Sequence, residues 1–175
     1  AVVHNESGVS RLRLVNAETQ RVLYTPKLYS GVIHSVAWRA DGFLAFDHEW
    51  AHSPGEVHVL DLSPVSRVRW QSAGLDGLDP SKLPIPVNGS FTSRDGTKFD
   101  AWFYYPGNYF DKGRHAQFSR LAVSGGLPAV ISYHGGPESQ FRPRYLGAYN
   151  YLPGEMNVVL VCPNVRGSRG YGKKF

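Results

Sequence analysis

The sequence predicts a mixed fold in which an antiparallel β half is followed by an α/β half. Residues 1 to about 70 form short runs of alternating apolar and polar residues, broken by turn residues, as antiparallel strands do. The last third contains two longer apolar runs, 128–133 and 157–162, and each opens into a glycine-rich loop. This spacing is typical of a strand–helix–strand unit with parallel strands, whose sites form at the carboxyl ends of the strands.

The composition is that of a globular chain. Of the 175 residues, 42% are hydrophobic and 13% aromatic, which is enough to build cores, and 19% charged residues is too few for a solvated disordered chain. The net charge of +5 comes from scattered Lys and Arg residues, so nucleic acid is not an expected partner. No uncharged apolar run reaches the roughly 18 residues that span a bilayer, so no membrane partner is expected either.

The single cysteine, Cys162, lies inside an apolar run and is interpreted as a buried core residue. One cysteine cannot form a disulfide within the chain, and the first residues lack the basic-then-apolar pattern of a secretion signal. A cytoplasmic location is therefore expected. The chain begins at Ala1 in what already reads as a strand, which indicates an excised segment.

The first half, residues 1–73, has the pattern of β-propeller blades. The clearest signal is the turn Arg39-Ala40-Asp41-Gly42 between two strand-like runs, which predicts a hairpin. The strand-like runs are 21–24, 31–38, 43–46, 55–62 and 68–70. Four short antiparallel strands form one blade, and a propeller needs at least four blades to close. The segment therefore corresponds to the last blade of a propeller and part of another.

The second half, residues 87–175, follows a Gly-, Asp- and Pro-rich linker at 74–86. The expected elements are a hairpin of strands at 87–93 and 98–105, an exposed loop at 107–127, a strand at 128–133, a helix within 140–152 and a strand at 157–162. An antiparallel hairpin followed by alternating strands and helices is the order in which an α/β-hydrolase sheet begins. We therefore expect the N-terminal portion of an α/β-hydrolase domain.

Three motifs carry a family resemblance. They are Ser93-Arg94-Asp95-Gly96, Tyr133-His134-Gly135-Gly136-Pro137 and the loop from Asn164 to Gly172. Together with the propeller-like prelude they resemble the prolyl oligopeptidase family of serine peptidases, in its acylaminoacyl-peptidase and dipeptidyl-peptidase branch. The resemblance implies a peptide substrate and no cofactor. Because both halves leave open sheet edges, pairing with the remainder of the catalytic domain or with another copy of the chain is expected.

The loop after the first long apolar run is the expected oxyanion loop. Acyl transfer builds negative charge on a carbonyl oxygen, and backbone N–H groups aimed at that oxygen lower the barrier. Gly135 and Gly136 allow such a turn because they lack a Cβ. The resemblance adds His134 as an oxyanion-side residue. Its ring N–H could contact the oxyanion, or the ring could only brace the loop.

The second loop is interpreted as structural. Arg166 could tie neighbouring carbonyls or a carboxylate, and Gly167 and Gly170 serve tight turns. No Gly-x-Ser-x-Gly elbow occurs in the chain, and the glycines around Ser168 lie at the wrong offsets for one. The catalytic nucleophile, acid and base are therefore expected after Phe175, and the segment alone is predicted to be inactive.

A competing interpretation comes from the stretch 48–58, which satisfies the metzincin zinc-peptidase expression. The residues that would hold zinc and act as base are His48, Glu49, His52 and His58. The mechanism needs the first two histidines one turn apart on a helix. The hairpin signal at 39–42 and the alternation around residue 58 favour strands instead. No metal is predicted, and a helix over 43–52 would reverse that preference.

Two further interpretations of the sequence are a phosphate-binding loop and a non-catalytic binding module. Gly167 to Lys173 has the spacing of a phosphate-binding loop, but Lys174 stands where Ser or Thr should ligate magnesium. A non-catalytic propeller-type binding module, in which exposed aromatic residues contact a partner, is the remaining functional class.

Overall fold

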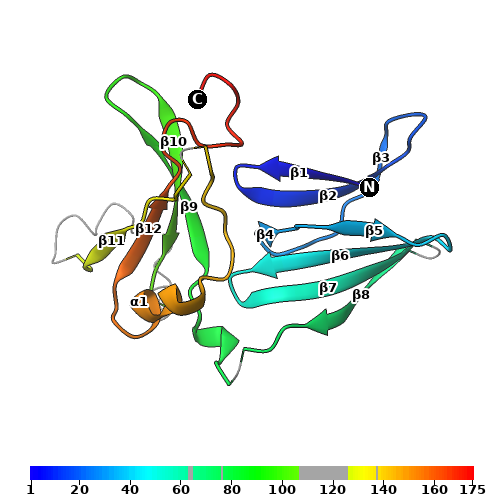
Figure 1. The fold of residues 1–175 in the computed structure, drawn as a ribbon, viewed down its shortest axis with the longest axis horizontal. Coiled ribbons are helices and arrows are strands. Elements are labelled where there is room, and N and C mark those ends of the chain that lie inside the picture. Colours follow the sequence, from blue (N-terminus) through cyan, green and yellow to red (C-terminus); the bar gives the residue numbers. More distant parts are fainter. Residues whose placement is uncertain (63–64, 76, 107–125, 137) are drawn as a thin grey trace. The chain divides into compact units, whose positions relative to one another are not determined.

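The structure is a computed structural model that describes residues 1–62, 65–75, 77–106, 126–136 and 138–175. Most of the loop expected at 107–127, and Pro137 of the first glycine loop, lie outside the described residues. The chain divides into two compact units. Unit 1 consists of Ala1–Leu78 together with Arg142–Tyr145, and unit 2 consists of Asp79–Phe141 together with Leu146–Phe175 (Figure 1).

Unit 1 contains two antiparallel sheets. Strands β1 (Val2–Glu6), β2 (Val9–Val15) and β3 (Val22–Tyr24) form the first. The second has the order β4 (Gly31–Val32), β6 (Phe43–Trp50), β7 (Ser53–Leu62) and β8 (Val65–Ser72), and β5 (Val36–Trp38) pairs with the remaining part of β6. These sheets confirm the antiparallel β half that the alternating pattern predicts.

The hairpin predicted at 39–42 is confirmed. Strands β5 and β6 pair antiparallel on either side of it, and Arg39 N donates to Phe43 O at 2.8 Å. Gly42 has φ +90°, a left-handed conformation that glycine adopts without the strain of a Cβ.

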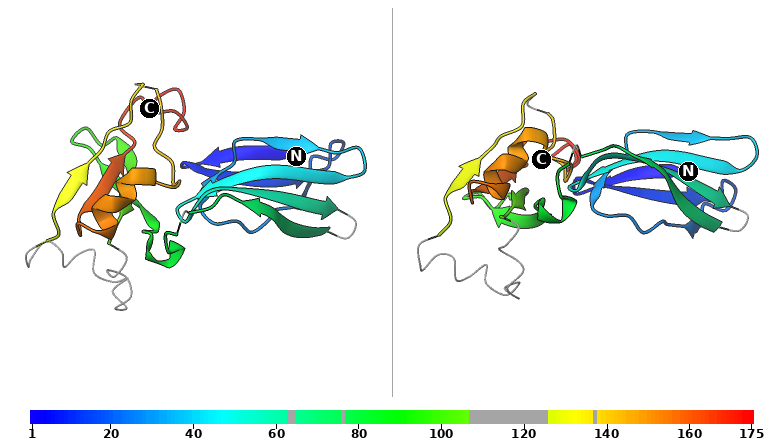
Figure 2. Two further views of the ribbon diagram at one scale, coloured as in Figure 1. Left: turned by 60° about the horizontal axis from the view of Figure 1, so that its bottom comes forward. Right: turned by 90° about the horizontal axis from the view of Figure 1, so that it is seen from below.

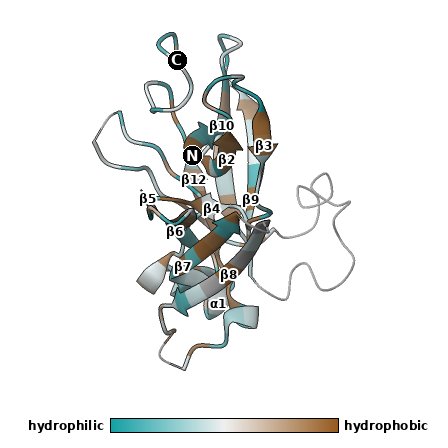
Figure 3. Ribbon diagram, turned by 90° about the vertical axis from the view of Figure 1, so that its right-hand side faces the viewer, coloured by the Kyte–Doolittle hydropathy of each residue, from teal (hydrophilic) through white to brown (hydrophobic). Residues whose placement is uncertain are grey.

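The core of unit 1 follows from alternation along the strands, because every second side chain of a strand faces the same side. Its buried members are Leu12, Leu14, Ile33, Leu44, Phe46 and Leu60. Figure 3 shows hydrophobic and hydrophilic residues along the same strand in β7. The core therefore draws on both sheets of the unit.

Residues 142–145 complete unit 1 from a distant part of the sequence. Arg142 donates from Nε to Gly8 O at 2.8 Å and from an Nη to Ser10 Oγ at 2.9 Å. Ser10 is buried, and its Oγ also accepts from Ile33 N. Burial lowers the pKa of Arg142, because the charged form loses hydration.

Unit 2 contains one mixed sheet with the order β11-β12-β10-β9. Strands β9 (Pro86–Thr92) and β10 (Lys98–Tyr104) form the predicted hairpin, and β12 (Val159–Pro163) adds antiparallel to β10. Strand β11 (Ala129–Ile131) pairs parallel with β12, as the two apolar runs predict. Figure 2 shows β11 at one edge of this sheet.

The helix expected within 140–152 is much shorter than predicted. A 3₁₀ turn at Gly147–Asn150 leads into α1, which comprises only Tyr151–Gly154. Pro143 and Gly147 interrupt the segment before it, because proline lacks an N–H and glycine disfavours helix. A second 3₁₀ turn, Pro80–Lys82, lies in the linker region.

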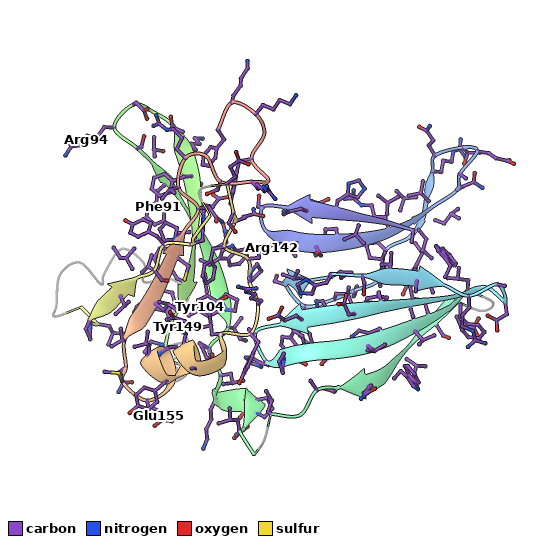
Figure 4. All side chains as sticks on the ribbon, in the orientation of Figure 1. Phe91, Arg94, Tyr104, Arg142, Tyr149 and Glu155 are labelled. Carbon is purple, nitrogen blue, oxygen red and sulfur yellow. The ribbon has the colours of Figure 1, made fainter. Side chains whose placement is uncertain are left out.

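The core of unit 2 lies on β10 and β12. Trp102 faces Cys162 across the pair and Tyr104 faces Leu160, and all four side chains are buried. Tyr104 also contacts the Phe141 ring edge to face. Figure 4 shows Tyr104 within the unit and Arg94 pointing away from the tip of the β9–β10 hairpin. Among the described residues, no helix is long and apolar enough to cross a membrane.

Candidate functional site

The two glycine-rich loops lie in unit 2, directly after the strands that position them. The loop 132–136 follows β11, and the loop 164–172 follows β12. Because β11 and β12 are parallel neighbours, their carboxyl ends lie at the same edge of the sheet. This edge is therefore the candidate site.

His134 connects the two loops. Its Nε2 lies 2.8 Å from Ser168 Oγ, and Ser168 Oγ donates its only proton to Val165 O at 2.6 Å. The ring must therefore donate from Nε2 to the serine oxygen. The His134 ring thereby links the first glycine loop to the second.

Gly135 and Gly136 form the exposed turn that follows. Gly136 has φ +55°, and its carbonyl accepts from Ser139 N at 2.6 Å. Within the part of the chain that the structure describes, neither Gly135 N nor Gly136 N donates a hydrogen bond to a protein group. Two backbone donors are thus accessible at the carboxyl end of β11.

Asn164 fastens the segment after this turn to the end of β12. Its Oδ1 accepts from Phe141 N at 2.7 Å, and its Nδ2 donates to Phe141 O and to Tyr171 Oη, both at 3.0 Å. The side chain is fully buried. Asn164 therefore holds the segment at Phe141 against the loop that follows β12.

Arg166 ties the second loop to the β9–β10 turn. One of its Nη atoms donates to Asp95 Oδ2 and lies 3.4 Å from Thr97 Oγ1. Hydrogen bonds from Ser93 Oγ, from the Thr97 N–H and from Arg166 hold the pKa of Asp95 well below its usual range. All three motifs of the family resemblance are thus joined within unit 2.

The glycines of the second loop adopt conformations that other residues rarely take. Gly167 has φ +91° and Gly170 has φ +88°. Between them, Ser168 is buried and bonded at its hydroxyl, so it is not an accessible nucleophile. Beside this loop is a pocket of 150 Å³ between the β9–β10 turn and Phe175, which is smaller than typical small-molecule sites.

The helix required by the zinc-peptidase alternative is not formed. Residues 43–50 are strand β6 and residues 53–62 are strand β7, so alternation along the strands prevails over the string match. His48 is buried in β6, whereas the neighbouring Glu49 pairs with the exposed His34 at 3.1 Å. Successive residues of a strand face opposite sides, so the Glu49 carboxylate cannot act as the general base for a metal ion bound by His48.

Asn164 is the residue of the candidate site whose role the sequence does not reveal. It stands inside a recognised motif, but asparagine there reads as one more turn residue. Its partners, Phe141 and Tyr171, come from both sides of it in the sequence. A polar residue directly after a buried strand is the one signal that could have drawn attention to it.

The comparisons with known proteins agree with the motifs. No family model matches the chain. A curated relative, the probable dipeptidyl-peptidase 5 of Aspergillus clavatus, is 27% identical over 122 residues, which are 67% of this chain and 15% of that protein. The chain therefore spans a small part of the length of this relative.

Solved structures show the same fold. A puromycin-hydrolyzing peptidase of Mycobacterium tuberculosis matches with a TM-score of 0.76 and 17% identity, over 99% of this chain and 25% of that one. Prolyl oligopeptidase B of Galerina marginata matches with a TM-score of 0.75 and 15% identity, over 98% and 23%.

The antiparallel sheets of the chain match the propeller part of prolyl oligopeptidase-family enzymes. The resemblance to that family is confirmed.

Proposed function

We propose that the chain is part of a serine-type peptidase that hydrolyses peptide or acyl-amino-acid bonds through an acyl-enzyme. The dipeptidyl-peptidase relative and the puromycin-hydrolyzing neighbour support this proposal, because both are named as peptidases. In this proposal the segment supplies the oxyanion loop, and the nucleophile, acid and base belong to other parts of the intact protein.

The proposal includes a division of the chain. Residues 1–73 are strands from the end of a propeller, 74–86 are the linker, and 87–175 begin an α/β-hydrolase domain. The mixed sheet of unit 2 supports the last assignment, since its antiparallel hairpin is followed by a parallel pair. The boundary between Leu78 and Asp79 falls inside the proposed linker.

The observation that carries the proposal is the turn at Gly135 and Gly136. Its accessible N–H groups lie at the carboxyl end of a parallel strand, where sheets of this kind form their sites. In this proposal they stabilise the oxyanion, while His134 holds the loop through Ser168. Loss of one oxyanion donor in a known hydrolase costs about 2.7 to 4 kcal/mol.

A serine-directed fluorophosphonate probe tests the reaction class. The full-length protein should be labelled, and the 175-residue segment alone should not, because it contains no nucleophile elbow. Full-length protein that is folded and remains unlabelled would refute the peptidase proposal.

A matched pair of variants at Gly135 tests the oxyanion role. Gly135→Pro removes the N–H, whereas Gly135→Ala keeps it, and an added Cβ there meets nothing within 4 Å. In the full-length protein, kcat should fall about 100- to 1,000-fold in the proline variant. The alanine variant should stay near wild type. Equal kcat values for the two variants would contradict the assignment.

A further inference from the structure

A buried polar cluster in unit 1 is separate from the site described above. It consists of His48 on β6 and of Glu56 and His58 on β7, and all three side chains are less than 10% exposed. His48 and Glu56 are direct partners in the antiparallel register, and His58 follows Glu56 by two residues. The three side chains therefore project from the same face of the sheet.

On β6 and β7 the neighbouring described positions of this face are apolar. The same alternating positions along β6 and β7 place Leu44, Phe46 and Leu60 in the hydrophobic core. The cluster thus occupies positions where the strand pattern would put aliphatic side chains.

The geometry brings the three groups to a common point. One ligand atom from each side chain lies within 4.8 Å of the other two. Glu56 Oε2 lies 2.9 Å from His58 Nε2, and Glu56 Oε1 accepts from Trp50 Nε1 at 3.2 Å. The Trp50 contact orients the carboxylate toward the histidines, as bonds from neighbouring side chains orient metal ligands.

The cluster also opens onto a pocket of 590 Å³ whose lining includes His48, Glu56, His58 and Lys27. Ligands of one zinc ion, at about 2.0 to 2.2 Å from it, lie roughly 3.3 Å apart, so the three side chains would have to rotate toward one another to share an ion. A fourth position on the ion would face the pocket, where water can reach it.

We propose that His48, Glu56 and His58 bind one divalent transition-metal ion of the zinc type. Two imidazoles and one carboxylate suit zinc, whereas calcium and magnesium prefer oxygen ligands alone. The ion would join β6 to β7 at the end of the core. This site differs from the zinc-peptidase arrangement, because Glu56 rather than His52 is the third ligand and Glu49 takes no part.

The first test uses tag-free full-length protein freed of metal by a chelator and titrated with Zn²⁺, with Mg²⁺ as the comparison ion. We expect saturable binding of one Zn²⁺ per chain, no competition from Mg²⁺, and a melting temperature that rises with zinc concentration. Cobalt substitution should give the visible d–d absorption of a four-coordinate ion. Absence of one-to-one zinc binding would overturn the proposal.

Variants assign the ligands. His48→Ala, His58→Ala and Glu56→Gln should each weaken zinc binding by at least about 100-fold, since even groups behind the ligands cost 10- to 100-fold. Glu56→Gln keeps the size of the side chain, and circular dichroism of the metal-free variants verifies that they fold. The matched control is His34→Ala, which removes an exposed histidine that is also bonded to a glutamate. Unchanged affinity in a folded ligand variant would overturn the assignment.

Lys27 distinguishes a metal from an internal ion pair. If the cluster binds a cation, Lys27→Ala removes a competing positive charge at the pocket and should leave zinc affinity equal or higher. If the carboxylate instead depends on Lys27 for its compensation, the variant should lower the melting temperature without zinc and gain nothing from zinc. The second result would overturn the proposal.

Discussion

His134 and Ser168 are separated by 34 positions in the sequence and joined by a hydrogen bond of 2.8 Å. Because the Ser168 hydroxyl donates its proton to Val165 O, His134 is the donor in its bond with Ser168 and its Nε2 carries the hydrogen. The contact links the side chains of the loops that follow the two parallel strands, beside the backbone hydrogen bonds from Arg169 N to the carbonyls of Glu138 and Ser139. It makes the first glycine loop dependent on the second.

The first prediction concerns this link. Ser168→Ala removes the acceptor, so the backbone amides of 134–139 should exchange with solvent faster, while those of the β9–β10 hairpin stay unchanged. Hydrogen-exchange mass spectrometry measures both. Ser139→Ala, at an exposed position of the same loop, is the control. Unchanged exchange at 134–139 in the Ser168 variant would show that the bond does not hold the loop.

The second prediction concerns Asn164. Asn164→Ala leaves the N–H and carbonyl of Phe141 and the hydroxyl of Tyr171 without this partner in a partly buried setting. Since an unsatisfied buried group costs about 1 to 3 kcal/mol, unit 2 should lose about 1 to 3 kcal/mol of unfolding free energy. Chemical denaturation measures the loss. Asn88→Ala, at an exposed position of β9, should change it by less than about 0.5 kcal/mol.

A third prediction uses two glycines of unit 1. A Cβ at Gly31 would lie 2.3 Å from Glu49 O and 2.6 Å from His48 Nε2, whereas one at Gly55 would meet nothing within 4 Å. Gly31→Ala should therefore cost about 3 kcal/mol or more, because backbone must move to admit the methyl group. Thermal unfolding of the two alanine variants compares them directly. Similar melting temperatures would contradict the tight packing of β4 on β6.

The fourth prediction concerns pH. Burial raises the pKa of the Cys162 thiol from 9.0 to about 12, because the thiolate would lose its hydration. Native protein at pH 8 should not react with a thiol reagent such as dithionitrobenzoate, and denatured protein should react once per chain.

The sign of the stability effect follows from the same shift. The native thiol keeps its proton to higher pH than the unfolded one. The contribution of Cys162 to the free energy of unfolding is therefore fully present below pH 9 and is lost as pH rises toward 12. Cys162→Ala should remove this part of the pH dependence. Denaturation of both proteins at pH 8 and pH 10 measures it, and identical pH dependence in both would contradict it.

Local signals predicted much of the fold. The Asp41-Gly42 turn defines its hairpin because two residues suffice to reverse the chain, and Gly42 adopts the required positive φ. The parallel pairing of β11 and β12 follows from two apolar runs of similar length. The helix within 140–152 was wrong in extent, because Pro143 and Gly147 interrupt the segment and the Asn164 side chain takes both backbone groups of Phe141.

Contacts between distant residues were harder to predict. A carboxylate was one of two kinds of partner considered for Arg166, but Asp95 lies 71 positions away and only the folded sheet selects it. The grouping of His48, Glu56 and His58 depends on the register of β6 against β7. The match of residues 48–58 to a zinc-peptidase motif pointed to a helix instead of to this pairing. Counting the register from the tight turn at 51–52 would have placed Gly55 opposite His48, whereas a register shift between His48 and Trp50 moves the pairing to Glu56.

Residues 142–145 determine when unit 1 can complete its folding during synthesis on the ribosome. The two hydrogen bonds that Arg142 makes to Gly8 and Ser10 close unit 1 with residues synthesised after β9, β10 and β11. The N-terminal unit therefore cannot complete its bonding while it is the only part that has left the exit tunnel. A polypeptide of residues 1–78 alone would lack the two hydrogen bonds of Arg142 permanently. Of the two groups that donate to Ser10 Oγ, only the Ile33 amide would remain.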